Sequence, residues 1–536
     1  MVRATGDGGI TGGRQLPLCV FLLSAALWAV NGFWLAADTR PPVWDMALHQ
    51  FYALNYMPGE APEAGAYWER SGNYPPFVHW VIALCCFLFG PGPDSAALAN
   101  LPATVLLLWS IAELCRELAS PGAARWACFL AAVTPYTMWM SRETILDYWL
   151  SAWFALFLVV LRKTCGFEAR RPALLLGAVM ALGMLTKWFF AAFAAAPLLW
   201  VAVRFRVWRS TERLVNLADA ALIAGLGAGF WYLPNIPRLL GYFADNMRIG
   251  ALEGEPPVLS FQSLIYYFRL LVGYQLLGVL ALLFVLAAAA VWRKKLMRDG
   301  TFLLAALGGG WLLMTLLRTK DPRFTMPLLG LTAVVCGAWI HSWKHTWRAA
   351  LARSALVIVL AVQAYAVNFG ISWLPEEIVI ARGYQGSLRW DWNFFLQHYF
   401  HILGPPRRED WKQEEILARM ARHAQGNGGV PTLALVPDLA RFNGANFQLA
   451  ARLAGIAARI GRMQSAANGI RSFAGVDYVV MTERDQGMPW TTREAPELNR
   501  IIVDHPEVFR LLGVYPLPNG DGARLYYIER GRVAPL

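Results

Sequence analysis

Long apolar runs with few charged residues alternate with short polar segments from the N-terminal region to about position 370. The first run, LPLCVFLLSAALWAVNGFWLAA at 16–37, is long enough for a helix that crosses a bilayer. It also exceeds the roughly 7–15 apolar residues of a cleaved signal peptide, so we expect a retained helix. The recurrence of such runs predicts a polytopic helical membrane protein.

Several of the later runs span only about 15 residues, short of the roughly 20 needed to cross a bilayer. If every run crossed, the early helices would have the wrong parity. We therefore expect 11–13 transmembrane helices, with 76–90 as a run that does not cross. The predicted spans after the first are 76–90, 98–115, 126–140, 148–161, 173–186, 188–203, 214–233, 264–292, 301–317, 326–341 and 349–370.

The net charge of +12 is concentrated in four short basic clusters. They lie at 162–171, 204–213, 293–298 and 344–353. Two apolar runs separate each cluster from the next, the spacing expected if all four face the cytoplasm. The basic character therefore reflects topology rather than nucleic-acid binding. It predicts a cytoplasmic N-terminus (1–15) and a transmembrane domain (16–370). A long first loop (37–75) and everything after 371 are then expected outside.

The apolar pattern stops after residue 371. Residues 371–425 are predicted to connect to a small α/β periplasmic domain at 426–536. PTLALVPD and VDYVVMTE are typical of strands, NGANFQLAARLAG of a helix, and RLLGVYPLPNGDGARLYYIER of a hairpin. The segment contains no cysteine, glycine-rich nucleotide loop, zinc-ligand spacing or nucleophile elbow.

Ionisable side chains gather in the segments expected outside. PPVWDMALH places Asp45 soon after the first run, with His49 four residues later on the same helix face. SRETILDYWL places Arg142 and Asp147 at the outer end of a run, and LGMLTKWFF places Lys187 where two short runs meet. Because charge is costly at membrane depth, such groups indicate a functional site.

LLRTKDPRFTMPLL adds Arg318, Lys320 and Arg323 within a short stretch, against the positive-inside bias. Basic residues kept outside indicate an anionic partner such as a lipid phosphate. Carboxylates can remove a proton from an attacking hydroxyl or amine. Together these groups suit displacement of a lipid phosphate by an acceptor nucleophile. The absence of a nucleotide motif favours a donor carried on lipid.

Five motifs occur in an order that resembles the GT-C membrane glycosyltransferases. They are PPVWDMALH, GNYPPFVHWVIALCCFLFG, SRETILDYWL, LGMLTKW and TKDPRFTMPLL. The likeness covers about residues 16–345 and is greatest to the bacterial branch related to protein O-mannosyltransferases and the lipid A aminoarabinose transferase (glycosyltransferase families 39 and 83). It implies inverting transfer of a sugar from a polyprenyl-phosphate carrier to a glycan, lipid or protein acceptor. The site would face the periplasm, in the bacterial inner membrane.

The resemblance also implies roles for individual residues. Asp45 matches the first-loop acid that deprotonates or orients the acceptor, and Asp147 matches the second catalytic acid. The basic positions at the donor phosphate match Lys187 and the 318–323 cluster. With His49, Tyr74 and Arg142 from the same segments, the candidate substrate-binding residues are His49, Tyr74, Arg142, Lys187, Arg318, Lys320 and Arg323. No cofactor is certain, and a divalent metal is left open.

Two positions depart from the family pattern. The lipid A branch has an acid–base pair before Pro-Pro, whereas this chain has Asn73 and Tyr74. The first-loop acid is often followed by a second acid, whereas Met46 follows Asp45. The acceptor and a bound metal therefore stay open.

Structural explanations exist for most of the candidates. His49 is expected to be a packing or orienting partner of Asp45 rather than a ligand. Asp45 could cap a helix, Asp147 could pair with Arg142, and Lys187 could extend to the interface without a task. The basic triplet could be an interfacial anchor in which Asp321 neutralises one partner.

Two other function classes compete with transfer. A lipid or solute transporter would place ionisable groups near the bilayer midplane, but only Glu113 and Asp219 clearly lie within apolar runs. A membrane anchor for a periplasmic binding domain would leave Asp45, Asp147 and Lys187 unexplained. The transferase is the favoured hypothesis.

Overall fold

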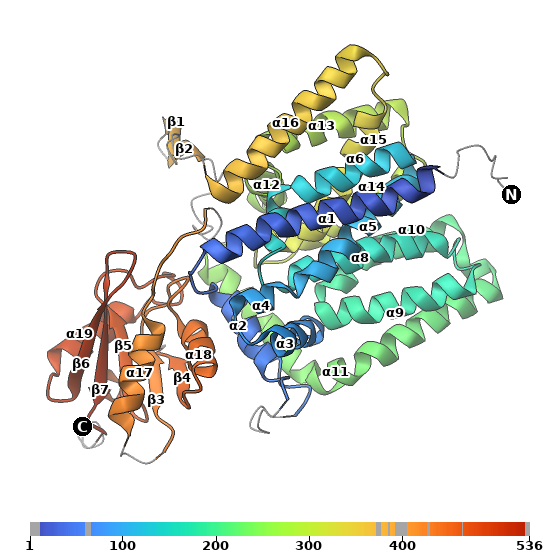
Figure 1. Cartoon of the computed structure of the whole chain (residues 1–536). Coiled ribbons are helices and arrows are strands. Elements are labelled where there is room, and N and C mark those ends of the chain that lie inside the picture. Colours follow the sequence, from blue (N-terminus) through green and yellow to red (C-terminus); the bar gives the residue numbers. More distant parts are fainter. Residues whose placement is uncertain are drawn as a thin grey trace. The chain divides into compact units, whose positions relative to one another are not determined.

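A computed structural model describes residues 11–58, 66–370, 377–383, 386–391, 405–425, 429–463 and 465–530 (Figure 1). The chain forms two compact units. The first comprises Met1–Trp34, Ala61–Val81 and Ala97–Pro405, and the second Leu35–Glu60, Ile82–Ala96 and Pro406–Leu536. Part of the predicted connecting segment 371–425 lies outside the described residues, and its last part, from Pro406, belongs to the second unit rather than to a connection. The structure divides the predicted first loop, because residues 35–60 belong with the C-terminal domain.

The first unit is a helical bundle. Its α-helices are α1 (Thr11–Ala37), α3 (Phe77–Phe89), α5 (Asn100–Leu118), α6 (Pro121–Val133), α7 (Pro135–Met140), α8 (Leu146–Lys163), α9 (Arg170–Thr186), α10 (Phe189–Arg204), α11 (Thr211–Leu252), α12 (Phe261–Leu270), α13 (Leu277–Lys294), α14 (Gly300–Thr315), α15 (Leu329–His341) and α16 (Trp347–Phe369). Shorter turns are η2 (Val207–Arg209), the π-helix η3 (Leu271–Gln275) and the 3-10 helix η4 (Pro322–Leu328). Helices α1 and α3 continue into the second unit. Helix α8 packs against α5 and α9, and α9 packs against α11.

The protein is a polytopic membrane protein. Within the described residues, six helical segments are long and apolar enough to cross a membrane. They are Gln15–Ala37, Pro93–Leu118, Thr211–Leu252, Leu277–Lys294, Pro322–His341 and Trp347–Phe369. Helices α3, α10 and α14 are shorter apolar helices. The 13 residues of α3 extend only about 20 Å, less than the roughly 30 Å hydrocarbon core.

Three predicted spans have different boundaries in the structure. The run 126–140 is two helices that break at Thr134, because a residue that precedes proline disfavours the α conformation. The run 214–233 continues to Leu252 as α11, through Pro234 and Pro237, so most of the interval between this run and the next predicted run (264–292) is helical. The run 264–292 is interrupted by the π-helix η3 between α12 and α13.

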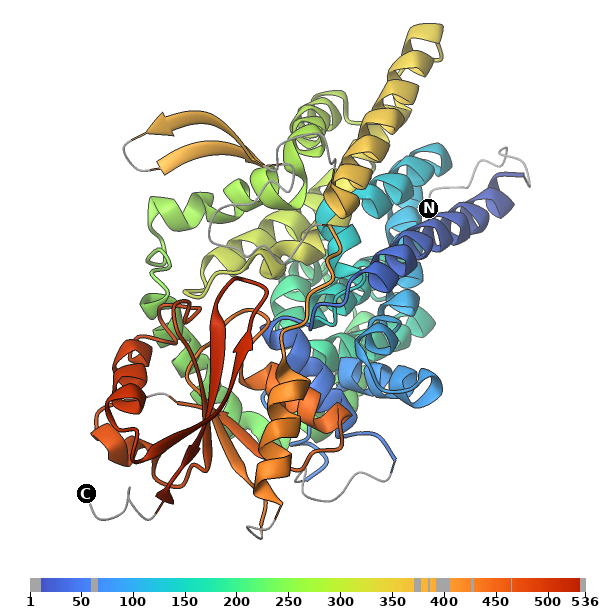
Figure 2. The same ribbon diagram turned by 60° about the vertical axis from the view of Figure 1, so that its left-hand side comes forward.

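Strands β1 (Glu377–Gly383) and β2 (Gly386–Asp391) form an antiparallel hairpin (Figure 2).

The second unit contains the predicted small α/β domain. Its sheet has the order β4-β3-β5-β7-β6, with β3 parallel to β4 and β5, and β7 antiparallel to β5 and β6. The elements are α2 (Trp44–Leu54), α4 (Pro93–Ala97), α17 (Gln413–Ala424), β3 (Thr432–Leu435), α18 (Gly444–Leu453), β4 (Arg459–Arg462), η5 (Gly469–Phe473), β5 (Tyr478–Thr482), α19 (Ala495–Asp504), β6 (Phe509–Pro516) and β7 (Gly522–Ile528). The two predicted strands, the helix and the β6–β7 hairpin are confirmed.

The sheet of the second unit buries both faces. Alternate residues of a strand point to opposite faces, so Val480 packs with α17 and α18 while Val479 packs with α19. Figure 1 shows α19 on one side of the strands and α17 and α18 on the other. Helix α2 packs against α18 and is therefore part of this domain.

Candidate functional site

A buried ion pair joins two helix ends in the first unit. Asp147 lies in the first turn of α8, where the helix dipole favours a carboxylate. Lys187 occupies the break between α9 and α10 in an extended conformation (φ −161°). Its Nζ lies 2.8 and 2.9 Å from the two carboxylate oxygens of Asp147. The side chains of Lys187 and Asp147 are 8% and 1% exposed, so this pair lies away from water.

Aromatic rings surround the ammonium group of Lys187. Its Nζ lies 5.1 Å from the ring centroids of both Phe189 and Phe324, and these two rings meet edge to face with their centroids 4.9 Å apart. Phe324 belongs to η4 and directly follows Arg323 in the chain. The structure thus brings the 318–323 segment next to Lys187. Cation–π contacts add to the attraction that holds the lysine.

Tyr74 contacts Trp188, the residue that follows Lys187 in the chain. Its ring stacks on Trp188 at 5.8 Å and an interplanar angle of 9°. Its hydroxyl lies 3.3 Å from the hydroxyl of Tyr242 in α11. Tyr74, Trp188, Phe189 and Phe324 thus form an aromatic wall beside the ion pair.

The three basic residues of the 318–323 segment have different environments. Lys320 is 3% exposed, and its Nζ donates to the carbonyls of Met314 (3.4 Å), Thr315 (2.6 Å) and Leu317 (2.6 Å) at the end of α14. Burial lowers the pKa of Lys320 to about 8. These contacts indicate a helix-capping role.

Arg323 pairs with Asp321 at 2.7 Å, the neutralisation that the sequence suggested. Arg318 is half-buried and has no side-chain hydrogen bond or ion pair to any residue that the structure describes. Of the three basic residues, Arg318 has the charge most available to a ligand.

The side chain of Arg142 contacts α1 and α16 rather than the Asp147–Lys187 ion pair. Its Nη1 donates to Asn368 Oδ1 in α16 at 2.5 Å, and its guanidinium lies 4.1 Å from the ring centroid of Trp34 in α1. The pairing of Asp147 with Arg142, considered from the sequence, is replaced by the pairing with Lys187. The side chain of Arg142 links the α7–α8 turn to α1 and α16.

Asp45 and His49 lie in the second unit, on α2. His49 is 1% exposed, as expected for a packing residue, whereas Asp45 is half-buried in the first turn of the helix. The indole Nε1 of Trp44 donates to Asp438 Oδ1 at 3.1 Å. The helix that carries the first-loop acid is thus bound to the C-terminal domain.

The two acids within apolar runs are both paired with basic residues. Glu113 accepts hydrogen bonds from Arg116 (2.7 Å) and Lys163 (3.0 Å), and Asp219 lies 3.2 Å from Arg170. Lys163 and Arg170 belong to the basic cluster at 162–171. Structural pairing therefore accounts for the only two acids that the sequence analysis placed clearly within apolar runs.

Glu253, just after α11, provides a test of the charges around the 318–323 segment. Burial, followed by the charges of Glu255 and Asp321, raises its pKa from 4.5 to about 7. The charged form is therefore disfavoured by folding, and stability falls as the pH rises from about 4.5 through 7. We expect Glu253→Gln to raise the melting temperature in detergent at pH 8 and to leave it unchanged at pH 4.5. An equal shift at both pH values would contradict the raised pKa.

The chain is similar to one known protein family over part of its length and to solved structures in its fold. Residues 73–230 match the family model described as dolichyl-phosphate-mannose-protein mannosyltransferase. No curated protein matches the chain. The crystal structure of ArnT from Cupriavidus metallidurans in the apo state is 15% identical with a TM-score of 0.59, over 94% of this chain and 97% of that one. ArnT bound to undecaprenyl phosphate gives 15% identity, a TM-score of 0.58 and the same coverage.

The chain has the GT-C fold. The family-model match includes Tyr74, Arg142, Asp147 and Lys187. Asp45 and the 318–323 segment lie outside the matched range. The fold predicted from the five motifs is therefore confirmed, and the roles of the individual residues remain predictions.

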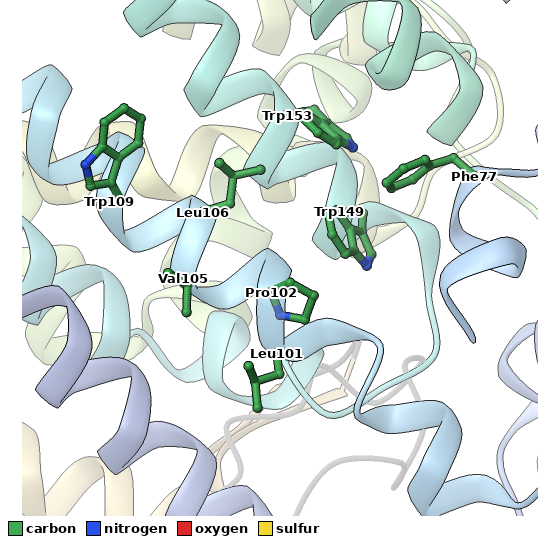
Figure 3. Close-up of a pocket in the computed structure, with 8 residues that line it drawn as sticks. All are labelled: Phe77, Leu101, Pro102, Val105, Leu106, Trp109, Trp149 and Trp153. Atoms are coloured by element: carbon green, nitrogen blue, oxygen red, sulfur yellow. The ribbon is translucent and has the colours of Figure 1, made fainter. Parts of the chain in front are cut away.

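An apolar groove of about 650 Å³ lies elsewhere in this GT-C bundle (Figure 3). Its lining residues are Phe77, Leu101, Pro102, Val105, Leu106, Trp109, Trp149 and Trp153. Trp149 and Trp153 follow Asp147 by two and six residues, which places them about 200° and 240° around α8 from it. The groove and the ion pair thus occupy different faces of α8. With no charged lining residue, the groove is not a site for phosphate chemistry.

No group of three or more His, Cys, Asp or Glu side chains that could hold a metal occurs within the described residues.

Sequence reasoning missed the aromatic wall around Lys187. Trp188 and Phe189 directly follow the lysine in LTKWFF, and Phe324 follows Arg323, so the residues themselves are plain in the sequence. The many other tryptophan and phenylalanine residues in apolar runs obscured this signal. The contacts of Asn368 and Asp438 had no local signal, because their partners lie 226 and 394 positions away in the sequence.

Proposed function

We propose that the protein is an integral-membrane glycosyltransferase that moves a sugar from a polyprenyl-phosphate carrier to an acceptor, with inversion at the anomeric carbon. The observation that supports it most is the buried Asp147–Lys187 pair with its aromatic wall, in a GT-C fold. The sugar, hexose or pentose, stays open. We place the active site on the periplasmic face of a bacterial inner membrane.

In this mechanism the basic groups bind the leaving phosphate. Lys187 and Arg318 stabilise the negative charge that grows on the phosphate as its bond to the anomeric carbon breaks. The electron pair of that bond leaves with the polyprenyl phosphate. Because phosphate is a good leaving group, no acid is required to protonate it. Asp147 orients Lys187 in its buried position through the ion pair.

Asp45 acts on the acceptor. Its carboxylate takes the proton of the attacking hydroxyl or amine as the new bond to the anomeric carbon forms. Attack from the side opposite the phosphate inverts the configuration. The aromatic faces of Tyr74 and Trp188 provide a surface on which the uncharged sugar ring stacks.

The comparisons support the carrier class without deciding it. ArnT was crystallised with undecaprenyl phosphate, and the matched family model is described by a dolichyl-phosphate donor. Both are sugar-carrier lipids with one phosphate. A polyprenyl phosphate is accordingly the donor class that we propose for this chain.

The test is release of polyprenyl phosphate by purified protein in nanodiscs. The protein is offered a panel of polyprenyl-phosphate hexoses and pentoses with a membrane-glycan extract, with and without a chelator of divalent cations. Acceptor-dependent release with one donor would support the proposal. Failure of release with every donor, together with movement of the lipid between leaflets, would replace it with the transporter.

A further inference from the structure

The segment that leads into α2 is bound along its length by the C-terminal domain. Backbone hydrogen bonds join Thr39 N to Arg407 O (3.0 Å) and Trp44 N to Ala440 O (3.1 Å). The Asp38 carboxylate accepts from Arg407 N at 2.8 Å, and the Thr39 hydroxyl accepts from Glu409 N at 3.0 Å. Partners that are 369 and 370 positions apart in the sequence are thus paired within one unit.

Two side chains hold the proline pair just before Asp45. Arg441 Nη1 donates to the carbonyl of Pro41, and Asn446 Nδ2 donates to the carbonyl of Pro42 at 2.5 Å. Proline has no N–H and a fixed φ, so its carbonyl is the only backbone group by which it can be held. Because the backbone at Pro41 and Pro42 is stiff, fixing both carbonyls also fixes the direction in which α2 begins.

The side chains that make these contacts are buried, and further hydrogen bonds and an ion pair within the domain stabilise them. Arg441 and Asn446 are 8% and 3% exposed. The carbonyl of Arg441 itself accepts from Gln413 Nε2 of α17 at 2.6 Å. Asp438, which accepts from Trp44, is in turn paired with Arg462 of β4 at 2.7 Å. The hold on the segment therefore extends into the sheet and helices of the domain.

We propose that Arg441 and Asn446 are positioning residues for Asp45, so that the C-terminal domain sets the orientation of the first-loop acid. This inference rests on the proposed function, because it gives Asp45 the role of acting on the acceptor. The C-terminal domain then positions the acid that acts on the acceptor, rather than serving as a separate binding module.

The test uses Arg441→Ala, Asn446→Ala and Arg441→Lys in the full-length protein. Gln448→Ala is the matched control, because Gln448 lies on α18 like Asn446 but donates to Ile460 O of β4 at 2.9 Å. We expect the two alanine variants to lower kcat by about 10- to 100-fold, the cost of a small misplacement of a catalytic group. KM for the carrier should stay unchanged, and Arg441→Lys should recover part of kcat.

Amide hydrogen exchange over residues 44–54 provides a readout that does not need activity. We expect faster exchange in this peptide for both alanine variants and wild-type exchange for Gln448→Ala. Trp44→Phe, which removes the indole hydrogen bond to Asp438, gives a milder variant if an alanine variant fails to fold.

The outcomes separate the two proposals. If the wild type transfers no sugar, the proposed function fails, while the exchange data still report whether Arg441 and Asn446 hold α2. If transfer occurs and the alanine variants keep wild-type kcat and exchange, the positioning role is wrong. An equal loss of kcat in Gln448→Ala would also overturn it, because the effect would then be one of general domain stability.

Discussion

Asp45→Asn is expected to lower the rate of sugar transfer by about 10²–10⁴-fold, the usual contribution of a positioned general base. Asparagine has nearly the same shape but cannot accept the acceptor's proton. Asp45 is half-buried in the first turn of α2, where a neutral amide fits the same space. The measurement is release of polyprenyl phosphate in nanodiscs, with donor binding and melting temperature measured in parallel.

The matched control is Asp504→Asn, in the exposed last turn of α19 in the same unit. It removes one carboxylate from the C-terminal domain and should leave transfer unchanged. Equal release by wild type and Asp45→Asn would remove Asp45 from the chemistry. Attention would then move to Asp147 as the acid that acts on the acceptor.

Lys187→Met is expected to destabilise the protein by about 3–5 kcal/mol, because it leaves the carboxylate of Asp147 buried without its cation. The Asp147 side chain is 1% exposed, so water cannot replace the lost partner. The double variant Asp147→Leu/Lys187→Met replaces both charges with apolar groups of similar volume and should regain most of that stability. The measurement is the melting temperature in detergent for the single and double variants.

Transfer separates a structural pair from a functional one. We expect the double variant to fold and yet to transfer no sugar, because the phosphate has lost Lys187. Recovery of transfer together with stability would show that the pair is only structural.

The matched control for this pair is Asp219→Asn. It breaks the ion pair with Arg170, which begins α9 and whose side chain is 70% exposed. An exposed pair contributes about 0–1 kcal/mol, so a small effect on stability is expected.

The sequence by itself determined the class of fold. Hydrophobic runs and their breaks are local patterns, so they placed Lys187 between two helices and β5, α18 and the β6–β7 hairpin in the C-terminal domain. The pairing of Arg323 with Asp321 was also local, since the two residues are neighbours along the chain. Long apolar helices and the order of five motifs sufficed to predict a GT-C membrane protein.

The tertiary structure decided which charged groups meet. Asp147 pairs with Lys187, at a separation of 40 positions, rather than with the nearby Arg142, and Lys320 turns into the carbonyls of α14. The attachment of residues 38–44 to the C-terminal domain joins segments that are 400 and 404 positions apart at the two prolines. Such pairings depend on how helices and sheet pack, which no local pattern records. The sequence alone therefore identified the charged residues, and tertiary packing determined the partners of those that pair across the chain.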